Sequence, residues 1–407
     1  MKKVWDKWTR IALVKRILVG LILGAILGIA VPQATGIAIL GDVFVSALKA
    51  IAPLLVFFLV ISSLCNAGKS HGGVIKTVII LYMFSTVLAA VIAVFASMAF
   101  PVKMTLANAA TDTSAPQGIV EVLNNLLLNV VANPVSSLVN ANYVGILMWA
   151  VLLGLAFRAA DKMTKKVLAD VADGISMVVT WIINLAPFGI FGLVFNTVST
   201  NGLDIFTTYG KLLLLLVGCM LFIYFVTNPL LVYWCIRQNP YPLIFHCLKR
   251  SALTAFFTRS SAANIPVNMK VCEEMGLDRD TYSVTIPLGA TINMDGAAIT
   301  ITVMTMAAFT LGIHVDIPTA IILSLLAALS ACGASGVAGG SLLLIPMACS
   351  LFGISDDISM QVVAVGFIIG VVQDSVETAL NSSSDLLLSA SAEFRQWRLE
   401  GKEIKFK

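Results

Sequence analysis

The stretch GFIIGVVQDSVETALNSSSDLLLSASA, residues 366–392, is long and apolar enough to span a membrane, yet it carries side chains that lipid excludes. On a helix its polar groups fall on one face, because the steps between successive turns are three or four residues. These groups are Asp374, Glu377, Thr378, Asn381 and Asp385. An ionisable side chain at the bilayer centre costs at least ~2.5 kcal/mol on the mildest scale, so this face must turn toward protein, water or an ion. We expect the chain to be organised around it.

The composition is that of a membrane protein. Hydrophobic residues make up 58% of the 407, the mean hydropathy is +0.95 and 12% of residues are charged, against about a quarter in soluble proteins. The apolar runs exceed barrel strands and show no alternation, which predicts an all-α polytopic fold rather than a β-barrel. The seven cysteines lack paired or CxxC spacing and the three histidines lie far apart, so neither disulfides nor a metal centre are expected. Trp5 and Trp8 indicate an interfacial anchor before a retained first helix rather than a signal peptide.

Eight transmembrane helices and two re-entrant hairpins are predicted. The spans are 11–31, 42–64, 75–100, 118–157, 174–198, 207–236, 281–311 and 357–393. Two further apolar segments, 245–275 and 318–353, are interrupted by TRSSAANIP and ACGASGVAGGS, whose Gly, Ser and Pro break a helix. Non-helical backbone at membrane depth is tolerated only inside protein or along a watery cavity, so both tips should lie at the functional centre.

Charge predicts the orientation. With the N-terminus inside, all but four of the 26 lysines and arginines fall on the cytoplasmic side. The four exceptions are Lys49, Lys103, Lys211 and Arg259, the last in the first hairpin tip. The balance holds only if each hairpin returns to its own side. Each hairpin also precedes a helix with polar groups, which is an inverted repeat typical of secondary transporters.

Buried charge indicates a cation-binding site. Arg259 stands against four acids expected at bilayer depth, Asp295, Asp374, Glu377 and Asp385, so an ammonium group, Na⁺ or H⁺ must supply the missing positive charge. The glycines Gly289 and Gly296 around Asn293-Met294-Asp295 favour an unwound turn whose carbonyl oxygens suit Na⁺.

Several other groups carry two interpretations. Ser260, Ser261 and the glycine-rich run 333–340 can offer hydroxyls and backbone N–H groups to a carboxylate, although close helix packing also explains the glycines. Tyr82, Ser85 and Thr86 share a helix face and can supply oxygens, or can bond to their own helix. No nucleotide-binding or hydrolase motif has a supporting context, so an enzyme is disfavoured and transport should draw on an ion gradient.

The motifs TRSS, NMDG, SACGASGVAGG and D-x-x-x-T-x-x-N-x-x-x-D from Asp374 resemble those of the dicarboxylate/amino acid:cation symporter family, which has the glutamate transporter-like fold. The resemblance covers nearly the whole chain. It implies a homotrimer in which residues 1–236 form mainly the trimerisation scaffold, with parts of spans three and six joining the transport domain. Residues 237–393 would then be the transport core, moving as an elevator with the second hairpin as outer gate, and residues 394–407 a cytoplasmic tail.

The resemblance also implies ligands. Asp374 would bind the α-amino group of a substrate, while Asn381, Ser261 and the backbone of Gly336 and Gly340 would hold its α-carboxylate, with Ser260 and Thr378 beside them. Three sodium sites are implied, and no other cofactor. One uses Gly289, Asn293, Asn381 and Asp385; a second uses Thr291, Ser330, Ala331 and Gly333; the third uses Tyr82, Ser85, Thr86, Asn293 and Asp295.

Three positions depart from the carriers of acidic substrates. Glu377 stands where those carriers have arginine, Ala297 where they have threonine, and Gly370 where the family has a further acid. A second carboxylate against Glu377 would cost several kcal/mol, so acidic substrates should be rejected. Glu377 can instead accept a hydrogen bond from a substrate hydroxyl while Arg259 balances its charge, which resembles the bacterial serine/threonine:sodium symporters of this family.

The predicted function is therefore sodium-coupled uptake of serine and threonine through the cytoplasmic membrane, with both termini inside and no nucleic-acid partner. Carriers of acidic amino acids or dicarboxylates, of other small neutral amino acids, or coupled to protons, remain alternatives. A channel or a membrane-embedded enzyme would belong to different classes.

Overall fold

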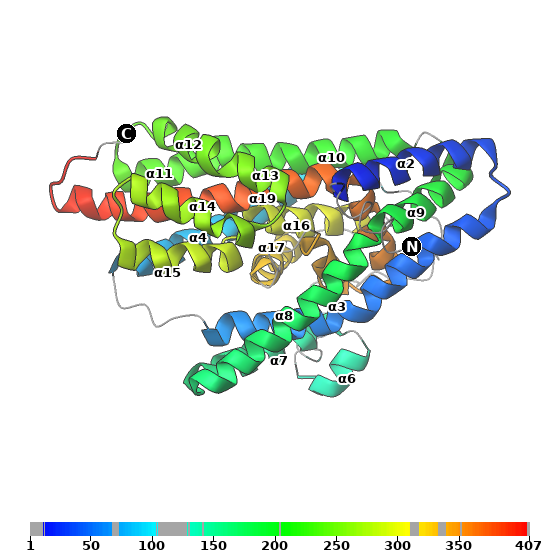
Figure 1. Cartoon of the computed structure of the whole chain (residues 1–407), viewed down its shortest axis with the longest axis horizontal. Helices are drawn as coiled ribbons and strands as arrows, with labels where there is room; N and C mark the ends of the chain where they lie inside the picture. The colour runs from blue at the N-terminus through cyan, green and yellow to red at the C-terminus, as the bar shows by residue number, and fades with distance from the viewer. Residues whose placement is uncertain are drawn as a thin grey trace.

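A computed structural model describes residues 11, 13–66, 73–102, 104, 128, 131–140, 142–202, 205–309, 317–332, 339–350 and 352–404 (Figure 1). Every regular element in these ranges is helical. The α-helices are α2 (Leu13–Ala30), α3 (Ile39–Asn66), α4 (Gly73–Ala99), α6 (Pro134–Val139), α7 (Tyr143–Ala156), α8 (Lys162–Asn184), α9 (Ala186–Asn201), α10 (Ile205–Phe222), α11 (Asn228–Ile236), α12 (Tyr241–Cys247), α13 (Leu253–Thr258), α14 (Ser261–Glu274), α15 (Arg279–Ile292), α16 (Asp295–Phe309), α17 (Ile317–Ala331), α18 (Ile345–Ser350) and α19 (Asp356–Leu399). The predicted all-helical class is confirmed.

Several helical stretches are long and apolar enough to cross a membrane. In the described part of the chain these are Gly73–Ala99, Lys162–Asn184, Thr207–Ile236, Arg279–Ala308 and Asp356–Leu399. The stretch from 207 joins α10 to α11 through a π-helical turn at Ile223–Thr227. These helices agree with a polytopic membrane protein.

Two predicted spans are divided differently in the structure. The first part of the span predicted over 118–157 lies outside the described residues, at 118–127. In the second part, α7 begins only at Tyr143. The Asn142 side chain caps this helix by accepting the N–H of Gly145 at 3.3 Å. The span predicted over 174–198 consists of two helices. They meet at Leu185, two residues before Pro187, which has no backbone N–H to donate to the preceding helix.

The C-terminal tail also differs from the prediction. From the sequence we expect residues 394–407 to form a short, basic and frayed tail, but α19 continues to Leu399. Phe394 is fully buried and its ring lies 5.1 Å from that of Trp397, while Arg398 Nε donates to the Cys235 carbonyl at 3.0 Å. These contacts tie the last turns of α19 to α11, so the basic character of the tail does not detach it.

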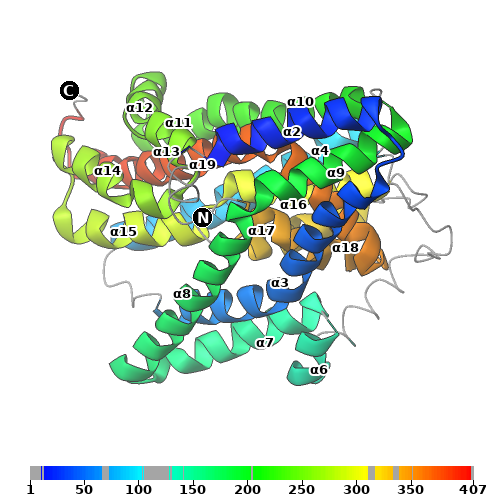
Figure 2. The ribbon, with the colours of Figure 1, turned by 45° about the vertical axis from the view of Figure 1, so that its right-hand side comes forward.

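One group of helices is built on glycine. Helix α2 packs along α9, and α3 packs against α7, α8 and α9; α3, α7 and α8 lie together on one side of the molecule in Figures 1 and 2. A Cβ on Gly20 would lie 2.2 Å from the Pro187 carbonyl oxygen, and one on Gly24 would lie 2.6 Å from that of Phe191. The four-residue glycine spacing of α2 therefore lets two backbones approach closely, as in small-xxx-small packing of membrane helices.

The other helices gather around α19. It contacts α10, α11, α13, α14, α15, α16 and α18, and it is buried over most of its length from Ile358 to Phe394. Helix α4 joins this group by packing on α16 and α17. The most polar long helix of the chain is thus enclosed by protein, as its polar face requires.

The first interrupted segment is a helix–turn–helix. Helix α13 ends at Thr258, Arg259 has the left-handed φ of 52°, and Ser260 caps α14 by accepting the N–H of Ala263 at 3.2 Å. A buried polar network attaches this unit to α19. Asn264 donates to Ser382 Oγ at 2.8 Å, and Asn268 donates to the Ser382 carbonyl at 2.8 Å.

The second interrupted segment leaves α17 at Ala331 and resumes as a 3₁₀ turn, Ser341–Leu344, before α18. Gly339, just before this turn, has a φ of 74°, a conformation that glycine adopts without strain. Residues 333–338, including Gly333 and Gly336 of the predicted sites, lie outside the described residues.

Candidate functional site

The chain unwinds between α15 and α16, at the NMDG segment, as the sequence predicted. Asn293 has φ −98° and ψ 80°, outside the helical region, and Asp295 begins the next helix. Asn293 Nδ2 donates to Asp385 Oδ1 at 2.9 Å and to Ser384 Oγ at 2.8 Å. The break therefore lies directly against the polar face of α19.

Gly289 makes this approach possible. A Cβ at this position would lie 2.7 Å from Asp385 Oδ1 and 2.8 Å from the Tyr82 hydroxyl oxygen. The Tyr82 hydroxyl donates to the Asp385 carbonyl at 2.9 Å and lies 2.7 Å from Ser389 Oγ. Three of the predicted sodium-binding positions thus meet, with α4, α15 and α19 each supplying one.

Two oxygens in this cluster are buried with their hydrogen-bonding capacity unused. Asn293 Oδ1 and Asp385 Oδ2 have no hydrogen-bond partner among the residues described here, although both side chains are enclosed by protein. A buried polar atom without a partner is costly. An amide oxygen and a carboxylate oxygen are hard ligands, and this donor set fits a hard cation such as Na⁺.

Asp295 is the centre of a second set of oxygens. It accepts the Ser85 hydroxyl at 2.7 Å and the Thr86 hydroxyl at 3.2 Å, and it is fully buried at the start of α16. Thr86 Oγ1 also accepts the N–H of Met294 at 3.3 Å. The predicted face of α4 therefore serves Asp295 through Ser85 and Thr86, whereas Tyr82 lies with Asp385.

Two of the remaining predicted sodium ligands, Thr291 and Ser330, use their hydroxyls for hydrogen bonds inside their own helices. Thr291 donates to the Leu288 carbonyl at 2.7 Å, and Ser330 donates to the Leu326 carbonyl at 2.5 Å. Cys332 Sγ lies 3.6 Å from the Ile292 carbonyl, so the ends of α15 and α17 are neighbours. Thr291, Ser330 and the buried Ala331 can contribute backbone carbonyls there, but not free hydroxyls.

Asp374 links the two interrupted segments. Its Oδ2 receives Arg259 Nε at 2.6 Å from the first, and its Oδ1 receives the N–H of Gly339 at 3.1 Å from the second. From the sequence we expect Arg259 to balance the charge of Glu377. Its ion pair is instead with Asp374. The left-handed turn at Arg259 directs the guanidinium to Asp374, and Glu377, one turn further along α19, has donors of its own.

Glu377 lies in a cluster that sequence reasoning missed. Its Oε2 accepts the hydroxyls of Thr300 at 2.7 Å and Ser341 at 2.9 Å, and Nε2 of Gln373 at 2.5 Å. Of the three donors, only Gln373 could have been predicted from the sequence to contact Glu377, because it lies one helical turn before it. Thr300 and Ser341 come from α16 and from the 3₁₀ turn before α18, which no spacing within α19 can indicate.

The other predicted substrate ligands differ in whether their polar groups already have a hydrogen-bond partner. Asn381 Oδ1 accepts the N–H of Gly296 at 2.7 Å, and Asn381 Nδ2 lies 3.4 Å from Met294 Sδ, which places Met294 in the site. The Thr378 hydroxyl donates to the Asp374 carbonyl of its own helix at 2.8 Å. Two more, Ser261 at the start of α14 and Gly340 before the 3₁₀ turn, are buried.

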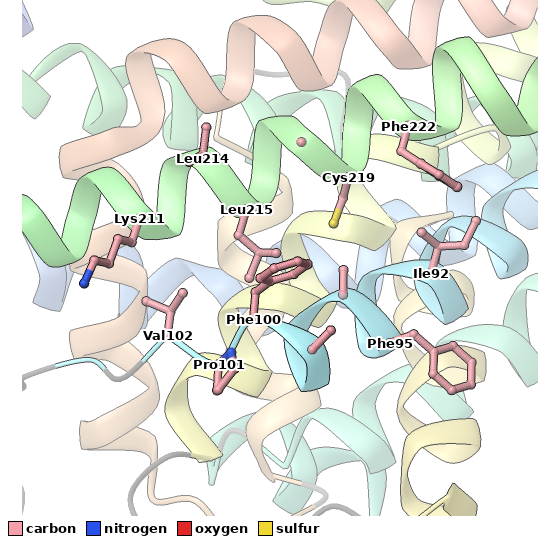
Figure 3. Close-up of a pocket in the computed structure, with 13 residues that line it drawn as sticks. Ile92, Phe95, Phe100, Pro101, Val102, Lys211, Leu214, Leu215, Cys219 and Phe222 are labelled. Atoms are coloured by element: carbon pink, nitrogen blue, oxygen red, sulfur yellow. The ribbon is translucent and has the colours of Figure 1, made fainter.

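A cavity of about 930 Å³ lies elsewhere, between α4 and α10 (Figure 3). Its walls are apolar side chains such as Phe95, Phe100, Leu215 and Phe222, with Lys211 at one end. None of the predicted site residues lines it. A charged amino acid needs several polar partners, so this cavity does not have the chemistry of the predicted substrate site.

A site of buried acids, a paired arginine and unused hard oxygens, enclosed in a multi-pass helical bundle, is that of a membrane transport protein rather than an enzyme. The sequence model of the sodium:dicarboxylate symporter family matches residues 13–393, and the chain belongs to this family. It is 57% identical over 406 residues to the serine/threonine transporter SstT of Bifidobacterium adolescentis, covering 99% of this chain and 94% of that protein. It is 55% identical over 400 residues to the serine/threonine transporter SstT of Streptococcus thermophilus, covering 98% of this chain and 100% of that protein.

Proposed function

We propose that this protein is a sodium-coupled symporter that takes up serine and threonine. The observation that carries the proposal is the pair of acids on α19. Asp374 and Glu377 are both buried, three residues apart, and Glu377 is held by three neutral donors. The names of the relatives and the family membership support the same substrate class and coupling ion.

Substrate binding follows from the charges. The α-ammonium of an amino acid approaches Asp374, and its α-carboxylate approaches Asn381, the first turn of α14 at Ser261 and the backbone at Gly340. The side chain then extends toward Glu377. A carboxylate there would meet Glu377 in a poorly solvated place, which excludes acidic substrates, whereas a hydroxyl can donate to it.

Sodium binds, in this proposal, beside the α15–α16 break. Asn293 Oδ1 and Asp385 Oδ2 are the unused oxygens there, and Asp295 offers a second carboxylate held by Ser85 and Thr86. A third site draws on backbone carbonyls of Thr291, Ser330 and Ala331, with Gly333 outside the described residues. The break lies against the same face of α19 as the substrate ligands, so ion and substrate binding stabilise one arrangement of these helices.

The transport cycle is proposed as an elevator within a homotrimer. Eight helices span the cytoplasmic membrane with both termini inside, and the interrupted segments 245–275 and 318–353 are re-entrant hairpins, the tip of the second lying outside the described residues at 333–338. Residues 237–393, joined by parts of α4, α10 and α11, form the moving domain, and the remainder of residues 1–236 forms the scaffold. The packing of α4, α10 and α11 on the α16–α19 group supports this division.

The test is uptake of radiolabelled serine by proteoliposomes that contain the purified protein. We expect accumulation to require an inward Na⁺ gradient and to be competed by threonine but not by aspartate. Accumulation that follows a pH gradient and ignores Na⁺ would replace sodium by protons. Competition by aspartate or a dicarboxylate would favour the alternative substrate class.

A further inference from the structure

The donors around Glu377 form a built cluster with a defined direction. Thr300 on α16, Gln373 on α19 and Ser341 in the 3₁₀ turn all reach the same oxygen, Oε2. Thr300 and Gln373 are fully buried, and Ser341 is 2% exposed. Three separate elements therefore converge on one atom of one side chain.

The chemistry of the groups fixes which atom donates. A carboxylate only accepts hydrogen bonds, so all three partners must donate to Glu377. Gln373 Nε2 also lies 2.7 Å from Thr300 Oγ1, and its Oε1 has no hydrogen-bond partner within the described ranges. The amide nitrogen thus faces both partners. The Thr300 hydroxyl accepts from Gln373 and turns its own hydrogen to Glu377.

The other oxygen of Glu377 is left open. Oε1 takes no hydrogen bond from any residue in the part of the chain that the structure describes. Glu377 is also the member of the cluster that keeps most surface, 5% against none for Thr300 and Gln373. Three hydrogen bonds on Oε2 fix the rotation of the carboxylate, so the lone pairs of Oε1 have a fixed direction too.

We propose that Gln373, Thr300 and Ser341 are positioning residues for substrate selectivity: they hold Oε2 of Glu377 so that Oε1 accepts the side-chain hydroxyl of the substrate. This inference rests on the proposed transport of serine and threonine. Without the donors the carboxylate rotates among several orientations, and the hydroxyl loses a partner of fixed geometry. Alanine has no hydroxyl and gains nothing from that geometry. The donors therefore favour serine over alanine.

The experiment compares serine and alanine uptake by proteoliposomes under an inward Na⁺ gradient, using the full chain. Thr300→Val and Gln373→Met remove one donor each at nearly constant volume. We expect Vmax/KM for serine to fall about tenfold, mainly through KM, the order expected for one hydrogen bond to a charged group. Vmax/KM for alanine should change by less than about twofold, because the lost geometry serves only a hydroxyl. Thr300→Ser, which keeps the hydroxyl, should restore the wild-type ratio of Vmax/KM for serine to Vmax/KM for alanine.

Thr302→Val is the matched control. Thr302 lies on the same helix, is equally buried, and its hydroxyl has no partner among the described residues. It should leave the ratio unchanged. Ser341→Ala removes the longest of the three hydrogen bonds, so we expect Vmax/KM for serine to fall about threefold. Because Ser341 lies outside α16 and α19, this variant still tests the proposal if a substitution in one of those helices prevents folding.

The outcomes separate the two proposals. A wild-type protein that takes up serine with Na⁺ but does not distinguish it from alanine would overturn the positioning role. Variants that lower both substrates equally, or neither, would do the same, while serine transport itself would stand. A wild-type protein with no Na⁺-dependent serine uptake would instead remove the proposed function.

Discussion

The substitution Gly289→Ala is a direct test of the oxygen cluster at the α15–α16 break. The added Cβ would lie 2.7 Å from Asp385 Oδ1, 2.8 Å from the Tyr82 hydroxyl and 2.9 Å from Asp385 Cγ. Contacts below 3.0 Å are essentially never adopted by real Cβ atoms, so one of these groups must move. Both are held. Asp385 accepts from Asn293, and the Tyr82 hydroxyl is bonded to Ser389 and to the Asp385 carbonyl.

The size of the effect follows from overpacking. One extra methyl group in a fully packed site costs about 1–3 kcal/mol, and each 1.4 kcal/mol is about tenfold in affinity. Moving Oδ1 also moves Oδ2 of the same Asp385 carboxylate, which is the oxygen proposed to bind sodium, so the cost should appear in sodium binding. We expect the Na⁺ concentration for half-maximal serine uptake to rise about tenfold or more.

The assay is a Na⁺ titration of serine uptake and of thermal stability, with Gly210→Ala in α10 as control. A Cβ on Gly210 meets nothing within 4 Å. This control should leave the Na⁺ dependence unchanged and should be neutral or stabilising by up to ~1 kcal/mol, because alanine favours a helix. An unchanged Na⁺ dependence in Gly289→Ala would refute the placement of Asp385 as an ion ligand.

Three further substitutions test separate parts of the molecule. Glu377→Arg should weaken Na⁺-dependent binding of serine at least about tenfold, because it replaces the hydroxyl acceptor by a donor; thermal shift with serine would measure it, and unchanged binding would contradict the proposed pocket. Asn268→Leu removes the donor to the Ser382 carbonyl and should cost about 1–3 kcal/mol of stability, seen as a lower unfolding temperature. Gly20→Ala brings a Cβ to 2.2 Å from the Pro187 carbonyl oxygen and should lower stability by about 1–3 kcal/mol. Unfolding at the wild-type temperature would show that α2 and α9 do not pack as described.

The features that the sequence predicted correctly are those with a local cause. The polar face of α19 follows from its helical period, and the interruptions at TRSS and NMDG follow from residues that break a helix. The structure brings Asn293, Asp295 and Asp385 close to the partners expected of them. In each case the information lies within a few residues, or in a charge that lipid cannot hold.

The features that were missed depend on which distant elements meet. Arg259 was paired with Glu377 because it was the one cation expected beside the four buried acids. Its ion pair is with Asp374, which lies three residues before Glu377 on α19. Thr300 and Ser341 have unremarkable sequence neighbours and gain their role from packing against Glu377. The boundary between α8 and α9 was lost because the residues on both sides of it are mostly apolar, and hydropathy does not register a change of direction.

The charge balance of the site gives a physical reason for ion coupling. Arg259 neutralises Asp374, whereas Asp295, Glu377 and Asp385 receive only hydroxyl or amide donors from the described residues. Serine is a zwitterion without net charge, so its binding cannot supply the missing positive charge. Neutral donors lower the cost of three buried carboxylates but do not remove it, and small cations do. A bound cation such as Na⁺ supplies positive charge to these buried acids, which gives a physical reason for the sodium coupling that membership of the sodium:dicarboxylate symporter family implies.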